Sequence, residues 1–237
     1  MVPRPVATAL AAVGAFLLDP AEPAPAVPLT APAALRPVIA VFGLSAGCGT
    51  TVVARALAAE LARRDAVGAA AVHSDSAPSG IPLATASASR LANALAHLPG
   101  AEARAVGRLC VLATGDRELM VDSARHLAPL VLDAGAGALG GAPAALADDV
   151  ILVAAPSTEP ALADVASDCL ARLGHDPVVV LNRAGRPPDA GRWKGRIAHA
   201  LPDSRMGSQL ALSGREPRGE LGHAIAKLAD RYAGGTR

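Results

Sequence analysis

Short apolar runs alternate with stretches of helical periodicity from residue 38 onward. The runs are Val38–Phe42, Val67–Val72, Leu109–Ala113, Leu130–Leu132, Val150–Ala155 and Val178–Leu181. They lack the polar alternation of a half-exposed strand, so we expect strands that are buried on both faces. Between them, apolar residues recur every three or four positions: Val53, Leu57 and Leu61; Leu91 and Leu95; Leu162, Val165, Cys169 and Leu173. This alternation predicts an α/β fold, with a doubly wound, mainly parallel sheet flanked by helices.

The first 36 residues follow a different pattern. The stretch 6–18 is apolar apart from Thr8, and residues 19–36 are rich in proline and alanine. The apolar stretch is shorter than the roughly 20 residues that a membrane-spanning helix needs. Three interpretations stay open for it: a helix packed on the domain or a partner, a peripheral membrane or partner anchor, and a cleaved signal. We divide the chain into an apolar segment (residues 1–18), a semi-rigid linker (residues 19–36) and one folded domain (residues 37–237).

Composition and charge narrow the possible functions. Half of the residues are apolar, but aromatic residues make up only 2%, and the formal net charge is +1. Few aromatic side chains and no basic run argue against a dedicated nucleic-acid surface. Three scattered cysteines, Cys48, Cys110 and Cys169, have no C-x-x-C spacing and predict neither a disulfide framework nor a zinc site. We therefore expect a cytoplasmic protein.

A glycine-rich turn follows the first apolar run and precedes an alanine-rich helix. It reads S-A-G-C-G-T-T over residues 45–51. Backbone N–H groups around Gly47, Cys48 and Gly49, together with the positive end of the helix that begins near Thr50, are suited to binding a phosphate. Thr51 occupies the position whose hydroxyl holds Mg²⁺ in phosphate-binding loops. The alternative is a tight strand-to-helix turn without a ligand.

Several motifs together resemble the ParA/MinD group of P-loop ATPases, whose deviant loop reads K-G-G-x-G-K-T-T. Residues 38–61 resemble the opening of these proteins. Four later motifs resemble theirs in the same order: L-V-L-D-A-G-A-G at 130–137, A-D-D-V-I-L-V-A-A-P at 147–156, V-V-V-L-N-R at 178–183 and L-P-D-S-R at 201–205. The resemblance spans residues 37–232 and implies a P-loop fold that binds ATP or ADP with magnesium.

The resemblance also implies roles for individual residues. Asp133 would hold magnesium through water, together with Thr51, and Asn182 would read the adenine edge. Pro202 and Asp203 would line the base. Each has a structural alternative, because a strand-end aspartate also caps turns and an asparagine is common in loops.

Both lysines of the family loop are absent, and Ser45 and Thr50 stand in their places. The second lysine neutralises the β- and γ-phosphates, and phosphoryl transfer depends on that charge. The first lysine reaches across the ATP-bound dimer in this family, so a homodimer would lose its main cross-subunit contact. Asp75 aligns with the aspartate that orients the attacking water. The resemblance therefore implies a nucleotide site with weakened or lost hydrolysis.

These features lead to two functional hypotheses. The first is a spatial organiser or assembly platform that acts through protein partners, resembling the pilus-localisation proteins of the TadZ/CpaE type, which serve pilus or secretion machinery. The second is a working ATPase in chromosome or plasmid partition, or in division-site placement, that recruits a cation from elsewhere. A ligase on the same fold would need paired acids in a substrate pocket, and none is evident.

The C-terminal stretch 219–232 has helical periodicity. Its apolar positions Leu221, Ile225, Leu228 and Tyr232 fall on one face. The opposite face mixes acidic and basic residues, whereas a lipid-binding helix is usually basic. We expect this helix to pack on the domain.

Overall fold

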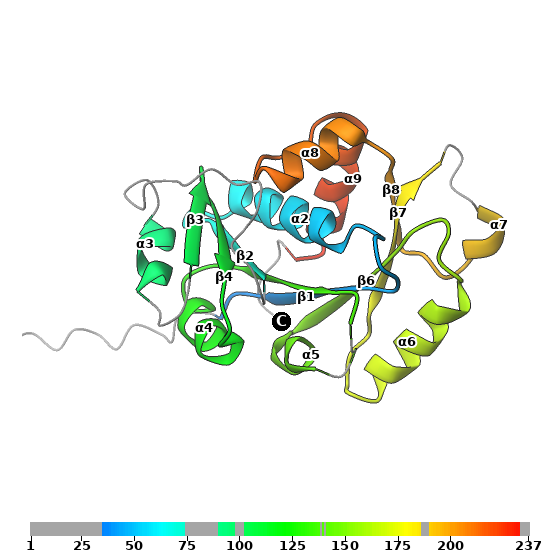
Figure 1. Ribbon diagram of the computed structural model, residues 1–237, viewed down its shortest axis with the longest axis horizontal. Helices are drawn as coiled ribbons and strands as arrows, with labels where there is room; N and C mark the ends of the chain where they lie inside the picture. The colour runs from blue at the N-terminus through cyan, green and yellow to red at the C-terminus, as the bar shows by residue number, and fades with distance from the viewer. Residues whose placement is uncertain are drawn as a thin grey trace, which may run out of the picture. The chain divides into compact units, whose positions relative to one another are not determined.

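The computed structural model describes residues 35–73, 90–97, 102–137, 139, 141–185 and 190–232. Leu35–Arg237 forms one compact unit, in which an eight-stranded sheet carries helices on both faces (Figure 1). The strands are β1 (Val38–Gly43), β2 (Ala69–His73), β3 (Glu102–Val106), β4 (Leu109–Ala113), β5 (Leu130–Gly135), β6 (Asp149–Ala154), β7 (Val178–Ala184) and β8 (His199–Pro202). The helices are α2 (Thr50–Arg64), α3 (Arg90–Ala96), α4 (Arg117–Ala124), α5 (Ala142–Leu146), α6 (Ala161–Ala171), α7 (Ala190–Trp193), α8 (Arg205–Leu212) and α9 (Gly219–Ala229). The segment 1–18 and Asp75 lie outside the described residues.

The strand order is β3-β4-β2-β5-β1-β6-β7-β8. Every neighbouring pair is parallel except β3 with β4. All six apolar runs contribute strands, so the predicted α/β class with a mainly parallel, helix-flanked sheet is confirmed. The second run begins later than expected, because Val67 is exposed in the turn before β2.

Two strands were missing from the sequence prediction, and they form the two edges of the sheet. β3 reads E-A-R-A-V and is only partly buried, and β8 has just four residues. An edge strand is covered on fewer sides and tolerates charged residues, which also discourage pairing with another chain. Neither segment therefore carries the continuous apolar run that marks an interior strand.

The central strand β1 is buried along its whole length because helices cover both sides of it. Ile39 and Val41 face the layer that contains α2, α8 and α9. Val38, Ala40 and Phe42 face the opposite layer, which contains α3 to α7 (Figure 1). The alternation of side chains along a strand thus divides one apolar run between two hydrophobic clusters.

Helix α2 is the main helix of its layer. Its periodic residues Val53, Leu57 and Leu61 are all buried, as predicted. Alanines between them are buried too, which lets the helix backbone lie close to the sheet. At its end, Arg64 donates to Asp230 at 2.7 Å and to the carbonyl of Ala226 at 2.9 Å, which fastens α9 to α2.

The helix predicted from the periodicity of Leu162 to Leu173 exists as α6, but the prediction of its buried face was wrong. Leu162 and Val165 are 45% and 65% exposed, and Cys169 and Leu173 are exposed as well. The buried residues are Ala163, Ala166 and Leu170. Their spacing is equally helical, and the two small alanines allow a closer approach to the sheet than leucine does. Size rather than hydrophobicity therefore decides which face of α6 is buried.

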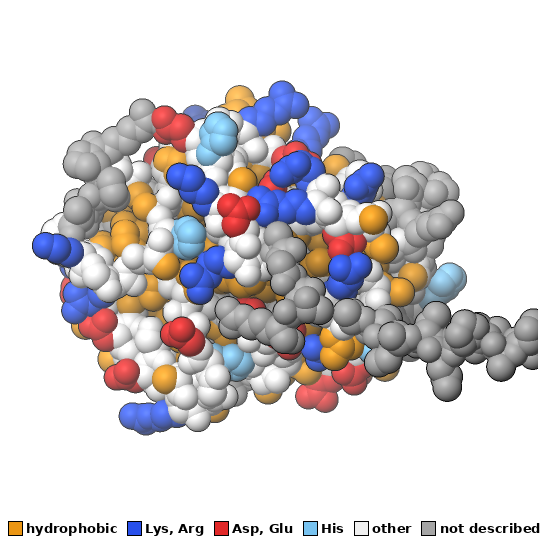
Figure 2. Space-filling view, turned by 180° about the vertical axis from the view of Figure 1, so that it is seen from behind, with side chains coloured by type: hydrophobic (Ala, Val, Ile, Leu, Met, Phe, Trp, Pro, Cys, Tyr) orange, Lys and Arg blue, Asp and Glu red, His pale blue; other side chains and the backbone are white. Residues whose placement is uncertain are grey.

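The predicted packing of the C-terminal helix is confirmed. Leu221, Ile225, Leu228 and Tyr232 are buried in the same cluster as α2. Basic and acidic side chains are interspersed over the face that Figure 2 shows. Among the described residues, every helix is too short or too polar to cross a membrane.

We expect Leu57→Ala to lower the free energy of unfolding by about 2–5 kcal/mol, because the fully buried side chain leaves a cavity between α2 and the sheet. Leu162→Ala is the matched control on another helix and should change it by no more than about 0.5 kcal/mol, since its side chain is exposed. Urea denaturation of the two variants measures both effects. Similar losses in the free energy of unfolding of the two variants would contradict the burial of Leu57 between α2 and the sheet.

Candidate functional site

The glycine-rich loop connects the end of β1 to the start of α2. Gly47 and Gly49 have φ values of 73° and 92°, in the left-handed region where glycine is favoured. Gly49 is also the N-cap of α2. Earlier in the turn, a Cβ on Gly43 would come too close to the Thr50 hydroxyl and the Cys48 sulfur. The local sequence therefore permits a compact turn that leads directly into a helix N-terminus.

A threonine and an aspartate meet beside this loop. β1 and β5 are parallel neighbours with Val41 opposite Asp133, so the carboxyl ends of both strands lie at the same edge of the sheet. Thr51, in the first turn of α2, donates its hydroxyl to Asp133 Oδ2 at 2.6 Å. Asp133 Oδ1 accepts from the backbone N–H of Gly135 at 3.1 Å. The family resemblance implies that both residues hold magnesium, and the structure brings their oxygen atoms together.

Asn182 approaches the loop from β7. Its side-chain amide donates to the Cys48 carbonyl at 2.9 Å, and the residue is buried. A Cβ on Gly49 would collide with the same amide nitrogen. Asn182 thus braces the backbone of the loop, and its contact with adenine stays a prediction.

Short polar side chains occupy the two lysine positions. Ser45 Oγ lies 2.9 Å from Thr158 Oγ1, and this threonine also accepts from the backbone N–H of Ala155 at 3.0 Å. Thr50 is buried, with its hydroxyl 3.3 Å from the sulfur of Cys48. Neither side chain brings a positive charge to the loop.

The remaining predicted residues lie farther along the same edge. Pro202 ends β8 and Asp203 follows it, with β6 and β7 between this strand and β1. Pro202 is partly exposed and Asp203 is exposed. Their role at the base stays a prediction, and so does the catalytic role of Asp75, which lies outside the described residues.

Two arginines near the site were missed by the sequence analysis. Arg117, in the first turn of α4, places Nη2 3.4 Å from the carbonyl oxygen of Asp133. Arg55 lies one helical turn after Thr51, is buried, and donates to the carbonyl of Leu212 at 2.6 Å. Burial lowers the pKa of Arg55, and the Asp133 carboxylate partly opposes that shift.

The sequence did contain a signal for Arg117. It follows a predicted buried strand by only a few residues, so it had to lie at the carboxyl edge of the sheet. For Arg55 the signal was its position on the helix, one turn from the loop. The structure therefore adds positive charge that the loop itself lacks.

The donor set suits magnesium bound with a phosphate better than a metal held by protein alone. Among the described residues, no three or more His, Cys, Asp and Glu side chains gather into a metal site. Magnesium keeps several water ligands and uses one or two protein oxygens together with phosphate oxygens. Thr51 and Asp133 supply such oxygens, and the helix N-terminus next to them favours an anion.

The chain is similar to known proteins in structure, but searches by sequence find no match. No protein-family model matches the chain, and no curated protein matches it. Among solved structures, a chain of the MinC:MinD cell division protein complex of Aquifex aeolicus aligns with a TM-score of 0.62 and 18% identity, over 85% of this chain and 97% of that one. A ParA family ATPase from Chlorobium tepidum aligns with a TM-score of 0.59 and 18% identity, over 82% of this chain and 98% of that one. MinD from Pyrococcus horikoshii, complexed with Mg-ADP, aligns with a TM-score of 0.55 and 18% identity, over 83% of this chain and 95% of that one. The chain therefore has the α/β P-loop fold of ParA and MinD.

We expect Gly49→Ala to destabilise the protein more than Gly47→Ala. Both substitutions force alanine into the left-handed region, at about 1–2 kcal/mol each. Only Gly49→Ala also drives a Cβ into the amide of Asn182, which adds about 1–3 kcal/mol of overpacking. Urea denaturation compares the two variants. Equal losses in the free energy of unfolding would contradict the close approach of Asn182, on β7, to Gly49.

Proposed function

We propose that the protein is a ParA/MinD-like nucleotide-binding protein that binds ATP or ADP with magnesium and has weakened or lost hydrolysis. The observation that carries this proposal is the 2.6 Å hydrogen bond from Thr51 to Asp133 beside a glycine loop at a helix N-terminus. A hydroxyl and a carboxylate at that position fit the protein ligands and water contacts of magnesium. Similar chains that bind nucleotide, such as the MinD complexed with Mg-ADP, support the choice of ligand.

Each part of the site has a role in this proposal. The backbone N–H groups around Gly47, Cys48 and Gly49, with Thr50 at the helix start, hold the phosphates. Thr51 and Asp133 hold magnesium, which supplies charge neutralisation for the phosphates when it is bound. The base lies toward Asn182, Pro202 and Asp203, on the strands that follow β6 in the sheet.

Hydrolysis is weakened because neutral side chains replace both lysines. Catalysis requires charge stabilisation that increases in the transition state, and a threonine at position 50 contributes little of it. Arg117 offsets part of this loss. Its guanidinium lies beside the main chain of Asp133, near the position where the magnesium and the terminal phosphate would bind. We assign Arg117 to the phosphate site as a binding residue.

The same arginine supports the second candidate function, an active ATPase in chromosome or plasmid partition or in division-site placement. That alternative needs a cation from outside the loop, and Arg117 is in a position to provide one. The leading function is a spatial organiser or assembly platform for protein partners such as pilus or secretion components. In both cases we expect a cytoplasmic protein. A homodimer would form only weakly, because Ser45 replaces the lysine that makes the main cross-subunit contact, and residues 1–18 are the candidate segment for peripheral membrane contact.

We expect weak but measurable binding of Mg-ADP and Mg-ATP by calorimetric titration. Arg117→Ala should weaken it by about 10-fold or more, the usual loss for one charged hydrogen bond. Arg125→Ala is the matched control. Arg125 is the C-cap of the same helix, and its guanidinium pairs with Asp148 at 3.1 Å at the opposite edge of the sheet. Its removal should leave nucleotide affinity unchanged.

This titration tests the nucleotide site and the role of Arg117 separately. No binding by the unmodified protein, with magnesium present, overturns the nucleotide site itself. Binding that Arg117→Ala and Arg125→Ala leave equally strong overturns only the role of Arg117. Asp133→Asn should reduce the magnesium dependence of binding, because it removes the carboxylate that accepts from Thr51.

Restoring the lysines tests the proposed loss of hydrolysis. Thr50→Lys together with Ser45→Lys should tighten ATP binding by about 10- to 150-fold and promote dimerisation, measured by calorimetry and light scattering. Phosphate release from the unmodified protein should be slow or absent over hours. Brisk release that Asp75→Ala abolishes would contradict the weakened site and favour the active ATPase. Thermal melting should first confirm that lysine is tolerated at the buried Thr50.

A further inference from the structure

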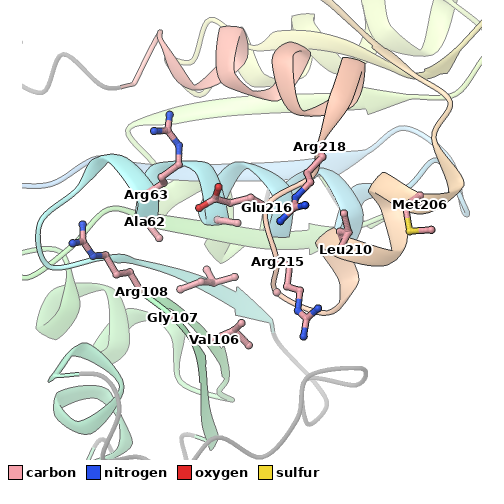
Figure 3. A pocket seen from close by; sticks show the side chains of 13 residues that line it. Ala62, Arg63, Val106, Gly107, Arg108, Met206, Leu210, Arg215, Glu216 and Arg218 are labelled. Carbon is pink, nitrogen blue, oxygen red and sulfur yellow. The ribbon is translucent and has the colours of Figure 1, made fainter.

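A groove lies at the far end of α2 from the nucleotide loop. It has a volume of about 880 Å³ and is formed by the end of α2, the β3–β4 turn, α8 and the segment between α8 and α9 (Figure 3). Ala62 lines it and follows Thr51 by eleven residues on the same helix, a distance of about 16 Å along the axis. The groove is thus separate from the site described above.

The floor of the groove is aliphatic. Val106, Leu109 and Leu210 line it, together with alanines of α2. Met206 stands at one side of the groove and is 67% exposed. Methionine is flexible and polarizable and adapts to varied apolar partners. A ligand that fills the groove would cover Met206 and the partly exposed side chains of Val106 and Leu210, whereas Leu109 and the alanines of α2 are already buried.

The rim of the groove is mainly basic. Four arginines line it, against one acidic residue, Glu216. Figure 3 shows Arg63 on α2, Arg108 in the β3–β4 turn, and both Arg215 and Arg218 on the segment after α8.

Not all four arginines are equally available to a ligand. Arg63 pairs with Glu60 at 2.7 Å, and Arg108 donates to the carbonyl of Asp65 at 3.4 Å. Arg215 and Arg218 are exposed, and neither guanidinium forms an ion pair within the described part of the chain.

We propose that this groove binds an acidic amphipathic segment of a partner protein, with aliphatic side chains on the floor and carboxylates on the arginines. The positive charges on the rim favour a negatively charged partner, and arginine binds carboxylates through two parallel hydrogen bonds. The aliphatic floor favours a protein segment as the ligand. An amphipathic helix binds in such a groove through apolar residues spaced at i, i+3, i+4 and i+7.

Nucleic acid fits this surface less well. Its affinity comes mainly from phosphate contacts, which need no aliphatic floor, and base stacking needs aromatic side chains. The residues that line the groove include no aromatic side chain. The arginines alone would suit either ligand, so the test must include both.

The probe is a synthetic helical peptide with leucine at i, i+3, i+4 and i+7 and glutamate at the flanking positions, labelled for fluorescence anisotropy. We expect it to bind the full chain with a dissociation constant in the micromolar range. A peptide of the same composition in scrambled order should bind at least about tenfold more weakly, because its leucines no longer share one face. A version with lysine in place of glutamate should not bind.

Variants of the protein locate the binding surface. Arg215→Glu with Arg218→Glu should weaken peptide binding by at least about tenfold, through loss of charged hydrogen bonds and added repulsion. Met206→Glu should weaken it as well, because it places a charge on the apolar side of the groove. Arg172→Glu is the control: it makes the same charge reversal at an exposed position after α6, on the other face of the sheet. It should leave binding unchanged.

Three results would overturn the proposal. The first is that the acidic amphipathic peptide does not bind. The second is that binding survives both the double arginine reversal and Met206→Glu, in proteins whose melting temperatures are unchanged. The third is that a double-stranded DNA oligonucleotide binds more tightly than the peptide and loses affinity in the double arginine variant, which would assign the surface to nucleic acid.

Discussion

The parallel pairing of β1 with β5 is the constraint on which the site depends. This register places Val41 opposite Asp133, so the glycine loop and the aspartate leave the sheet at the same edge. Burial of β1 on both faces holds the register, because a slip of one residue would move its side chains to the opposite cluster. The 2.6 Å contact between Thr51 and Asp133 follows from this arrangement. The chemistry at the edge thus rests on the packing of an aliphatic core.

The sequence was most informative where structure is decided locally. Interior strands appear as continuous apolar runs because they are buried on both faces, and all six were recognised. Edge strands carry no such run, so β3 and β8 were missed. On α6 two apolar stripes share the same periodicity. Burial of Ala163 and Ala166 in place of Leu162 and Val165 is decided by the distance from helix to sheet, which the sequence alone does not contain.

The same distinction applies to the site. The loop and Asp133 are marked by glycines and by the end of a strand, and both were found from the sequence. Arg117 and Arg55 act through side chains that cross from one element to another, and these contacts depend on the tertiary fold. The strand that carries Asn182 was predicted correctly. Its hydrogen bond to the Cys48 carbonyl was not, because that contact depends on how closely β7 approaches the loop. Its amide and the missing Cβ of Gly49 occupy neighbouring space, so glycine at position 49 has a packing reason beyond its dihedral angle.

Helix α2 connects the two surfaces of the domain. Its first turn lies at the glycine loop, where we propose that phosphate binds, and its last turns form one wall of the arginine-rimmed groove. Arg55, between them, donates to the carbonyl of Leu212 at the end of α8, the helix that also provides Met206 and Leu210 to the groove. A buried charged group bonded to a main-chain carbonyl is costly to separate, so α2 and α8 are held together near the site. Arg55 thus ties the helix that begins at the glycine loop to the helix that lines the groove, one helical turn after Thr51.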